Sequence, residues 1–422
     1  MSQAPASIRY SSVGETLEVP VINQLMSIPL EYPDILSLAA GFTDNAVLPS
    51  DLIGEIVAGL PHTNPNHEYL QYGTTQGRSI LRKLTCDRLN ALPMEQEHAF
   101  DKDLTFITNG SQQALFLATH TLCDPGDYVL VESPTYFVYL SMLQGLQVRP
   151  IGIPVDAQGR IDADALEAIL QDLKARGELP RLKAAYLIGY HANPSSRCLK
   201  LWEKEAVARL LENMQCRIPV IEDAAYRELA YDELDPTPSI MSLPCFDAFP
   251  KLYLGTYTKP LATGLKIGYG TCSDPEWFAK MVCAKGNQDF GSSNFSQAII
   301  EQVLLRNAYD SLTHQLGQHY GRKAELLDST LREFGLHERG WHWEKPAGGL
   351  LFWLRAPESI NTDMGEIFSE KCKQQGVIYV PGSFCFAPQA PRNFIRLSIG
   401  ALCDDKLVEA SRRFCEVASI SS

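Results

Sequence analysis

The sequence predicts an α/β protein: a three-layer large domain built on a mostly parallel sheet, followed by a smaller α+β C-terminal domain. From about residue 100, short and almost wholly apolar runs alternate with longer amphipathic runs. Unbroken apolar runs are typical of strands buried on both faces, as in parallel sheets covered by helices. After about residue 295 this alternation ends, and long helical runs are mixed with a few strands.

Each element follows from its own pattern. In the large domain we expect strands at residues 104–108, 128–132, 182–189, 218–223, 251–257 and 266–272. The amphipathic runs between and after them predict helices at 111–122, 136–144, 164–175, 201–215 and 275–285. Ligands gather at the carboxyl ends of the strands in such sheets, so residues that directly follow a strand are the candidates for function.

The two ends of the chain have a different character. The C-terminal part predicts a helical run at 296–334, a strand at 348–354 and a helix at 363–375, then strands near 377–380 and 394–399 and a helix from Asp404. The N-terminal part reads as an irregular arm with a helix at 19–27. We therefore expect an arm over 1–45 that contributes to the small domain and the substrate pocket, a large domain over 46–295 and a small domain over 296–422.

Charge and composition exclude several functions. The net charge of −13 argues against binding to nucleic acid or to an anionic membrane, since both need a basic surface. No signal-peptide pattern opens the chain and no apolar stretch is long enough to span a bilayer, which favours the cytoplasm. The 11 cysteines contain no Cys-x-x-Cys pair, so we expect reduced thiols and no metal site.

Lys259 is the first candidate for chemistry. It follows an apolar strand, is flanked by Thr256 and Thr258, and precedes a second cation at Lys266. Hydroxyls and a cation can hold a phosphate, and a lysine amine that loses its proton by desolvation can bond to an aldehyde. By itself this pattern fits an ordinary solvated loop lysine equally well.

Polar residues follow other predicted strands as well. Gly110, Ser111 and Gln112 open a helix after a strand, where free N–H groups attract an anion, although a plain helix cap explains them too. Tyr136 could stack on a flat ring or belong to the interior. Asn193, in an Asn-Pro pair, could donate to a phenolate oxygen or only form a turn.

Two charged residues complete the candidates. Asp223 ends an apolar strand and needs a partner there, either a protonated ring nitrogen or a protein cation, and Tyr226 could reach the same ligand. Arg396 lies in an otherwise apolar strand, where its guanidinium could pair with a carboxylate in two hydrogen bonds or point outward.

Together these residues resemble the fold-type-I enzymes that depend on pyridoxal 5′-phosphate (PLP), in particular the class I/II aminotransferases. The resemblance covers Gly41 to Arg396 and is closest to the branch of aminoadipate, kynurenine and aromatic aminotransferases, and to the enzymatic half of MocR-type regulators. The motifs keep the family's order: Tyr72-Gly73 before Gly77 to Arg82, Gly-Ser-Gln at 110–112, Glu-x-Pro-x-Tyr at 132–136, Asn-Pro at 193–194, Asp-x-x-Tyr at 223–226, Thr-x-Thr-Lys at 256–259, and Arg396.

The resemblance implies a role for each residue. Lys259, Asp223 and Tyr226 would be catalytic: the lysine bonds to the cofactor aldehyde and carries a proton, the aspartate keeps the pyridine nitrogen protonated, and the tyrosine acts on the ring oxygen with Asn193. Tyr136 would stack on the ring. Arg396 would clamp the α-carboxylate of the substrate, Gly41 would let the backbone approach it, and Asn193 would also bind the substrate. The phosphate would be held by Gly110, Ser111, Gln112, Thr256, Thr258, Lys266 and, from a neighbouring subunit of a homodimer with shared sites, Tyr72.

Two departures and two rival functions stay open. The family usually has arginine at Lys266 and continues Asn-Pro with Thr-Gly, where this chain has Ser195-Ser196.

The implied substrates are an L-amino acid (aromatic, aminoadipate-like or branched) and a 2-oxo acid such as 2-oxoglutarate. The same residues also serve carbon–sulfur lyases, decarboxylases and oxidases. A PLP-sensing regulator is disfavoured, because it would need a DNA-binding domain and only 40 residues precede Gly41, where the resemblance begins.

Overall fold

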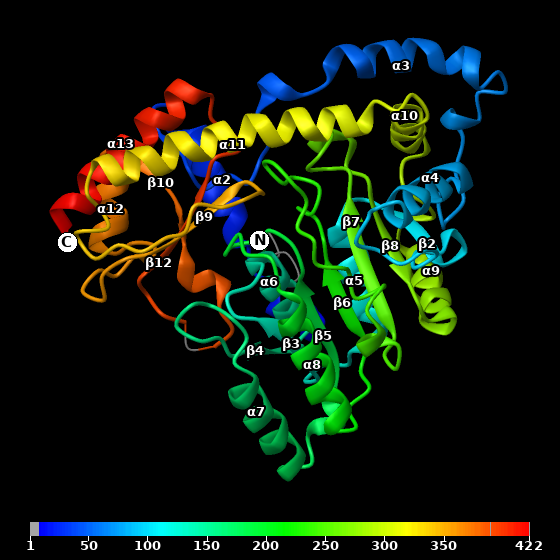
Figure 1. Ribbon diagram of the computed structural model, residues 1–422, viewed down its shortest axis with the longest axis horizontal. Coiled ribbons are helices and arrows are strands. Elements are labelled where there is room, and N and C mark those ends of the chain that lie inside the picture. The colour runs from blue at the N-terminus through cyan, green and yellow to red at the C-terminus, as the bar shows by residue number, and fades with distance from the viewer. Residues whose placement is uncertain (1–7, 389, 422) are drawn as a thin grey trace, which may run out of the picture.

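A seven-stranded sheet forms the centre of the computed structural model, which describes residues 8–388 and 390–421 (Figure 1). The first seven residues of the expected arm lie outside the described residues. The strand order is β2-β8-β7-β6-β5-β3-β4. The strands are β2 (Thr105–Thr108), β3 (Tyr128–Glu132), β4 (Arg149–Ile153), β5 (Leu182–Ile188), β6 (Val220–Asp223), β7 (Lys251–Thr256) and β8 (Gly268–Cys272).

The sheet is mostly parallel, which confirms the predicted fold class. Strands β4, β3, β5, β6 and β7 pair parallel in succession, and only β8 runs against its two neighbours, β7 and β2. The carboxyl ends of the parallel strands therefore lie at one edge, as the sequence predicts.

Alternate residues of one strand enter different hydrophobic clusters, which shows the three layers. Val129 and Val131 of β3 pack with helices on one face, whereas Leu130 packs with helices on the other. One face carries α5 (Ser111–Leu122), α6 (Phe137–Gly145) and α9 (Pro275–Asp289), and the other α7 (Ala163–Ala175) and α8 (Leu201–Asn213). Burial on both faces explains why these strands read as continuous apolar runs.

A smaller antiparallel sheet of order β11-β12-β9 lies in the C-terminal part. Helices α11, α12 and α13 pack against this sheet and share its hydrophobic core. The arm joins this part, since β1 (Leu36–Ser37) pairs parallel with β10 (Val377–Ile378). The other elements are β9 (Leu351–Arg355), β11 (Val380–Pro381), β12 (Phe394–Ser398), α11 (Tyr309–Glu333), α12 (Ile367–Gln374) and α13 (Asp404–Ser421).

The remaining helices belong to the arm and to one end of the large sheet. In the arm are α1 (Ser12–Thr16) and α2 (Val21–Glu31), where the sequence predicts one helix at 19–27. At the sheet's end, α10 (Asn294–Leu305) packs against α3 (Ser50–Thr63) and α4 (Ser79–Asn90), in one cluster with β7 and β8. The predicted boundary at 295/296 would make α10 the start of the small domain, whereas α10 packs beside the large sheet. The boundary therefore stays a prediction.

Several expected boundaries were wrong, and the backbone explains them. The run at 296–334 is two helices, because Asn307 between them takes a left-handed φ of +53°. The helix expected from residue 363 begins at Ile367, after Gly365 with φ +80°. The strand expected from Lys266 begins at Gly268, because Lys266 itself is left-handed at φ +56°. Strand β4 was not predicted, because it contains Pro150, and proline argues against a strand in the sequence. Proline is tolerated here because β4 lies at the edge of the sheet.

Candidate active site

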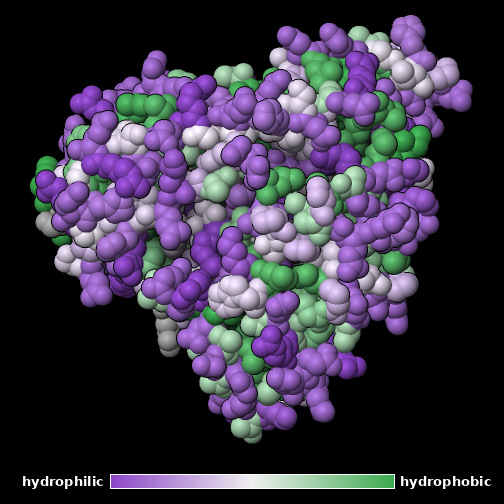
Figure 2. Space-filling model, viewed as in Figure 1, coloured by the Kyte–Doolittle hydropathy of each residue, from purple (hydrophilic) through white to green (hydrophobic). Residues whose placement is uncertain are grey.

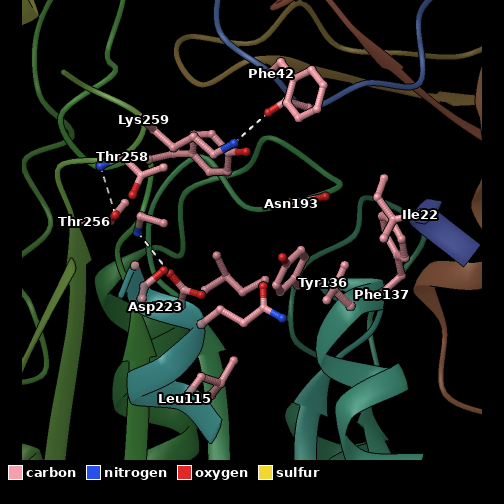
Figure 3. Close-up of a pocket in the computed structure, with 18 of the residues that line it drawn as sticks. Ile22, Phe42, Leu115, Tyr136, Phe137, Asn193, Asp223, Thr256, Thr258 and Lys259 are labelled. Carbon is pink, nitrogen blue, oxygen red and sulfur yellow. Dashed lines mark hydrogen bonds between the residues drawn. The ribbon is translucent and has the colours of Figure 1, made fainter. Parts of the chain in front are cut away.

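A cavity of about 450 Å³ opens at the carboxyl edge of the large sheet, below the arm (Figure 3). It is lined by segments that directly follow β2, β3, β5, β6 and β7, together with parts of the arm and of β12. The structure brings nearly all the predicted site residues to this cavity: Gly41, Gly110, Ser111, Gln112, Tyr136, Asn193, Asp223, Tyr226, Thr256, Thr258, Lys259, Lys266 and Arg396.

Lys259 stands in the loop after β7, and its amine points across the cavity. Nζ donates a hydrogen bond to the carbonyl oxygen of Gly41 at 2.6 Å (Figure 3). Burial and, to a smaller extent, the nearby positive charge of Arg396 together lower the pKa of the Lys259 amine from 10.5 to about 8. An amine with this pKa loses its proton near neutrality, which is what bond formation to an aldehyde requires.

Asp223 ends β6 beneath the same cavity and is 7% exposed. One carboxylate oxygen accepts from the Tyr186 hydroxyl at 2.8 Å and the other from the Ala225 N–H at 3.0 Å. Burial raises the pKa of the Asp223 carboxyl, and the two hydrogen bonds oppose that rise. Both donors are neutral, so a cationic partner such as a protonated ring nitrogen would complete the site.

The anion cradle forms where α5 begins. Gly110, with φ +73°, precedes the helix, and a Cβ on it would lie 3.8 Å from Thr258 Oγ1 and 3.9 Å from Lys266 Cε. These positions place a helix N-terminus, a hydroxyl and a cation around one point, which suits a phosphate. Gly268 makes the arrangement possible, because a Cβ there would come within 2.5 Å of the Gly110–Ser111 backbone.

Thr256 shapes this loop from within. Its hydroxyl donates to the Ile267 carbonyl at 3.1 Å and accepts from the Thr258 N–H at 3.0 Å. The hydroxyl is therefore occupied in holding the loop, although Thr256 also lines the cavity. A direct contact of Thr256 with the phosphate stays a prediction.

Arg396 on β12 is 2% exposed and reaches the cavity from the small sheet. It donates to Asn193 Oδ1 at 3.1 Å and to the Ala39 carbonyl at 2.7 Å, and its Nε is buried without a partner among the described residues. Burial lowers the pKa of the guanidinium. Both of these acceptors are neutral oxygens, so this buried cation can still receive a carboxylate.

Aromatic side chains line the space between the lysine and the arginine. The Tyr226 ring centre lies 5.9 Å from Lys259 Nζ, and burial raises the pKa of Tyr226 to about 12. Tyr136 precedes α6, and burial raises the pKa of its hydroxyl too. Figure 3 shows Tyr136 and Phe137 on one side of the cavity, with Ile22 of the arm beyond them.

Tyr72 is the predicted site residue that the structure does not bring to the cavity. Its side chain is 86% exposed and packs edge-on against Phe290, with ring centres 5.5 Å apart. Its predicted contact lies in a neighbouring subunit, so this position leaves the prediction open.

Sequence reasoning missed Tyr186, which holds Asp223, and Phe137, whose ring centre lies 5.1 Å from the Arg396 guanidinium. Tyr186 lies inside a predicted strand, and its contact depends on β5 and β6 being neighbours. The order of the strands carries no signal in the sequence.

Within residues 8–388 and 390–421, no cluster of His, Cys, Asp or Glu could hold a metal ion. Nor is any helix in that part both long and apolar enough to cross a bilayer.

These observations fit PLP. A cationic cradle, a buried carboxylate with only neutral donors, and a lysine of lowered pKa face one cavity wide enough for a small ring. The cofactor's phosphate, ring nitrogen and aldehyde each have a matching group there. Arg396 matches none of these cofactor groups and is available to bind the carboxylate of a substrate.

Comparisons with known proteins agree with this fit. The family model for aminotransferases of class I and II matches residues 33–414. An aromatic-amino-acid aminotransferase of Thermococcus litoralis is 30% identical over 408 residues, covering 96% of this chain and 93% of that protein. A 2-aminoadipate transaminase of Thermus thermophilus is 28% identical, with coverage of 94% and 93%.

Solved structures give the same picture. A kynurenine aminotransferase of Pyrococcus horikoshii, crystallised in complex with PMP, superposes with a TM-score of 0.87 at 28% identity, covering 97% of this chain and 96% of that one. The fold, the cofactor and the enzyme class predicted from the sequence are thereby confirmed. The chain belongs to the class I and II aminotransferases and is a PLP-dependent transaminase.

Proposed function

We propose that the enzyme moves the amino group of an L-amino acid to a 2-oxo acid, with 2-oxoglutarate as the acceptor. The donor is aromatic, aminoadipate-like or branched. The names of the similar enzymes, which act on aromatic amino acids, 2-aminoadipate and kynurenine, support this range. The observation that carries the proposal is one cavity that joins Lys259, Asp223 and Arg396.

Each residue has a role that follows from its surroundings. When bound, PLP supplies an electron sink that makes the substrate's Cα–H bond acidic. Lys259, with its lowered pKa, takes the proton from Cα. Asp223 stabilises a protonated ring nitrogen, and Arg396 receives the α-carboxylate and so fixes the direction of the Cα–H bond.

The cradle residues and the aromatic residues hold the cofactor. Gly110, Ser111 and Gln112 at the start of α5, with Thr258 and Lys266, bind the phosphate. Tyr136 stacks on the ring, while Tyr226 and Asn193 donate to the ring oxygen. Gly41 borders the open cavity, and a Cβ on it would meet no protein atom within 4 Å. Because glycine has no side chain, this space stays free, and the substrate carboxylate can approach the backbone there.

We also propose a homodimer with shared sites. Large apolar side chains are exposed on and beside α3, α4 and α10, and Figure 2 shows apolar side chains gathering at that end of the molecule. Tyr72 lies there and would reach the phosphate of the partner. The exposed residues are Val57, Leu70, Tyr72, Ile80, Phe290, Phe295 and Leu305.

A donor panel with 2-oxoglutarate tests the function. We expect glutamate and the donor's own 2-oxo acid in equal amounts, and, without an acceptor, one equivalent of 2-oxo acid per site. Release of ammonia, carbon dioxide or hydrogen peroxide in place of glutamate would identify a lyase, a decarboxylase or an oxidase. The Lys259→Ala variant is the control, folded but without turnover.

A further inference from the structure

Residues 39–44 form a backbone segment along the wall of the cavity, and three cationic side chains hold it. Arg396 donates to the Ala39 carbonyl at 2.7 Å and Lys259 to the Gly41 carbonyl at 2.6 Å. Lys323 Nζ donates to the carboxylate of Asp44 at 2.8 Å. The first two cations line the cavity, whereas Lys323 lies outside it, on α11.

The contact between Lys323 and Asp44 is buried and has several partners. The side chain of Lys323 is 0% exposed and also donates to the carbonyls of Gly400 and Leu402. Asp44 also accepts from His319, at 3.1 Å. The pKa of the Asp44 carboxyl is lowered: burial works to raise it, and the hydrogen bonds led by Lys323 outweigh that effect. Asp44 is therefore ionised in the folded protein.

The same segment is fitted to the strand that carries Arg396. The Ser398 N–H of β12 donates to the Leu38 carbonyl at 2.7 Å, just before the segment. A Cβ on Gly400 would lie 1.9 Å from the carbonyl oxygen of Phe42, so the two backbones touch. Lys323 bonds to both sides of this contact, through Asp44 on one and Gly400 on the other. It therefore fixes Gly41 relative to Arg396.

The three donors differ in what the proposed function asks of them. Lys259 and Arg396 serve the cofactor aldehyde and the substrate carboxylate, so their bonds to Gly41 and Ala39 compete with ligands. Lys323 has no such task. It is the donor that can hold the segment throughout the reaction.

We propose that Lys323 and Asp44 are positioning residues, which hold Gly41 and Arg396 in the arrangement that receives the α-carboxylate of the amino acid. This inference rests on the proposed function. Helix α11 is 25 residues long and extends from beside α12 and α13 towards α10 (Figure 1), so the pair also ties the cavity wall to a long helix. Neither residue touches the cavity.

The main test is the double variant Asp44→Asn/Lys323→Met, which removes both charges and leaves no buried charge unpaired. Asp44→Asn alone is the second variant, because asparagine keeps an acceptor for the Ala46 N–H that Asp44 now binds at 3.0 Å. Asp328→Asn is the matched control. Like Asp44, Asp328 is a buried carboxylate outside the cavity; it lies on α11, the helix of Lys323, and is bonded to Arg332 and Trp343.

We expect the double variant to raise KM for the amino donor about tenfold while kcat changes less than about twofold, because misplaced groups weaken the binding of the α-carboxylate equally in the ground state and the transition state. The Kd for PLP should stay at the wild-type value. In the PLP-free protein, hydrogen exchange should become faster in the peptide covering residues 38–48. Asp44→Asn should raise KM and the exchange rate at least as much, because it leaves Lys323 as a buried cation without its carboxylate. The control should show neither.

Unchanged KM and exchange in the double variant would overturn the proposal. So would equal effects in Asp328→Asn, which would show a general loss of stability. The exchange experiment needs no turnover, so it can fail or succeed independently of the proposed function. If the wild-type enzyme transaminates no amino acid, the proposed function fails first.

Discussion

The lowered pKa of Lys259 allows a quantitative test on the protein without cofactor. An amine with a pKa of about 8 is about one-quarter neutral at pH 7.5, whereas an amine with the ordinary value of 10.5 is neutral in about one molecule in a thousand. Burial of the side chain is the larger cause and the charge of Arg396 the smaller. The neutral fraction at working pH is thus raised about 200-fold.

The assay labels the PLP-free protein with an amine-reactive reagent over a range of pH and quantifies the peptide that carries residue 259. We expect a midpoint near pH 8 in the native protein and near 10.5 in denaturant. Arg396→Gln should move the native midpoint only part of the way back, because burial remains. A native midpoint near 10.5 would refute the reasoning, and a full return in Arg396→Gln would show that burial is not the main cause.

Further predictions concern stability, the ring, the carboxylate and the phosphate. Below pH 8 the folded PLP-free protein bears the full cost of a buried Lys259 ammonium, which disappears as pH rises towards 10.5, so Lys259→Met should melt higher than wild type at pH 7 and lose that advantage near pH 10. Asp223→Asn should keep PLP bound but lower kcat by about 10²-fold or more in a half-reaction assay. Arg396→Lys should raise KM for the donor about tenfold, through loss of the two-pronged hydrogen bond. Lys266→Arg should lower the Kd for PLP in a fluorescence titration, and an unchanged Kd would show that Lys266 does not reach the phosphate.

The sequence predicts the large sheet well, because its strands are buried on both faces and therefore apolar throughout. Leu130 and Val131 enter opposite clusters, yet both must be apolar. The predicted site residues meet in one cavity for a topological reason, since the ends of parallel strands share an edge. Local sequence patterns and the family's motifs were sufficient for this part.

What the sequence did not show depends on contacts between distant segments. Tyr186 reaches Asp223 only because β5 and β6 are neighbours in the sheet. Lys323 lies within the helical run predicted at 296–334, and nothing local marks it as buried. Its partner Asp44 is 279 residues away in the sequence. The break at Asn307 is a single backbone conformation inside a continuous helical pattern. Such features follow from packing, which local periodicity does not encode.

The bond between Lys259 and the cofactor aldehyde is the centre of this account, and borohydride reduction tests it most directly. The protein is loaded with PLP, reduced, digested and mapped by mass spectrometry. We predict that the pyridoxyl group is found on the peptide that contains Lys259, and that Lys259→Ala gives no labelled peptide. Labelling of a different lysine in the wild-type protein, or of none, would contradict the account.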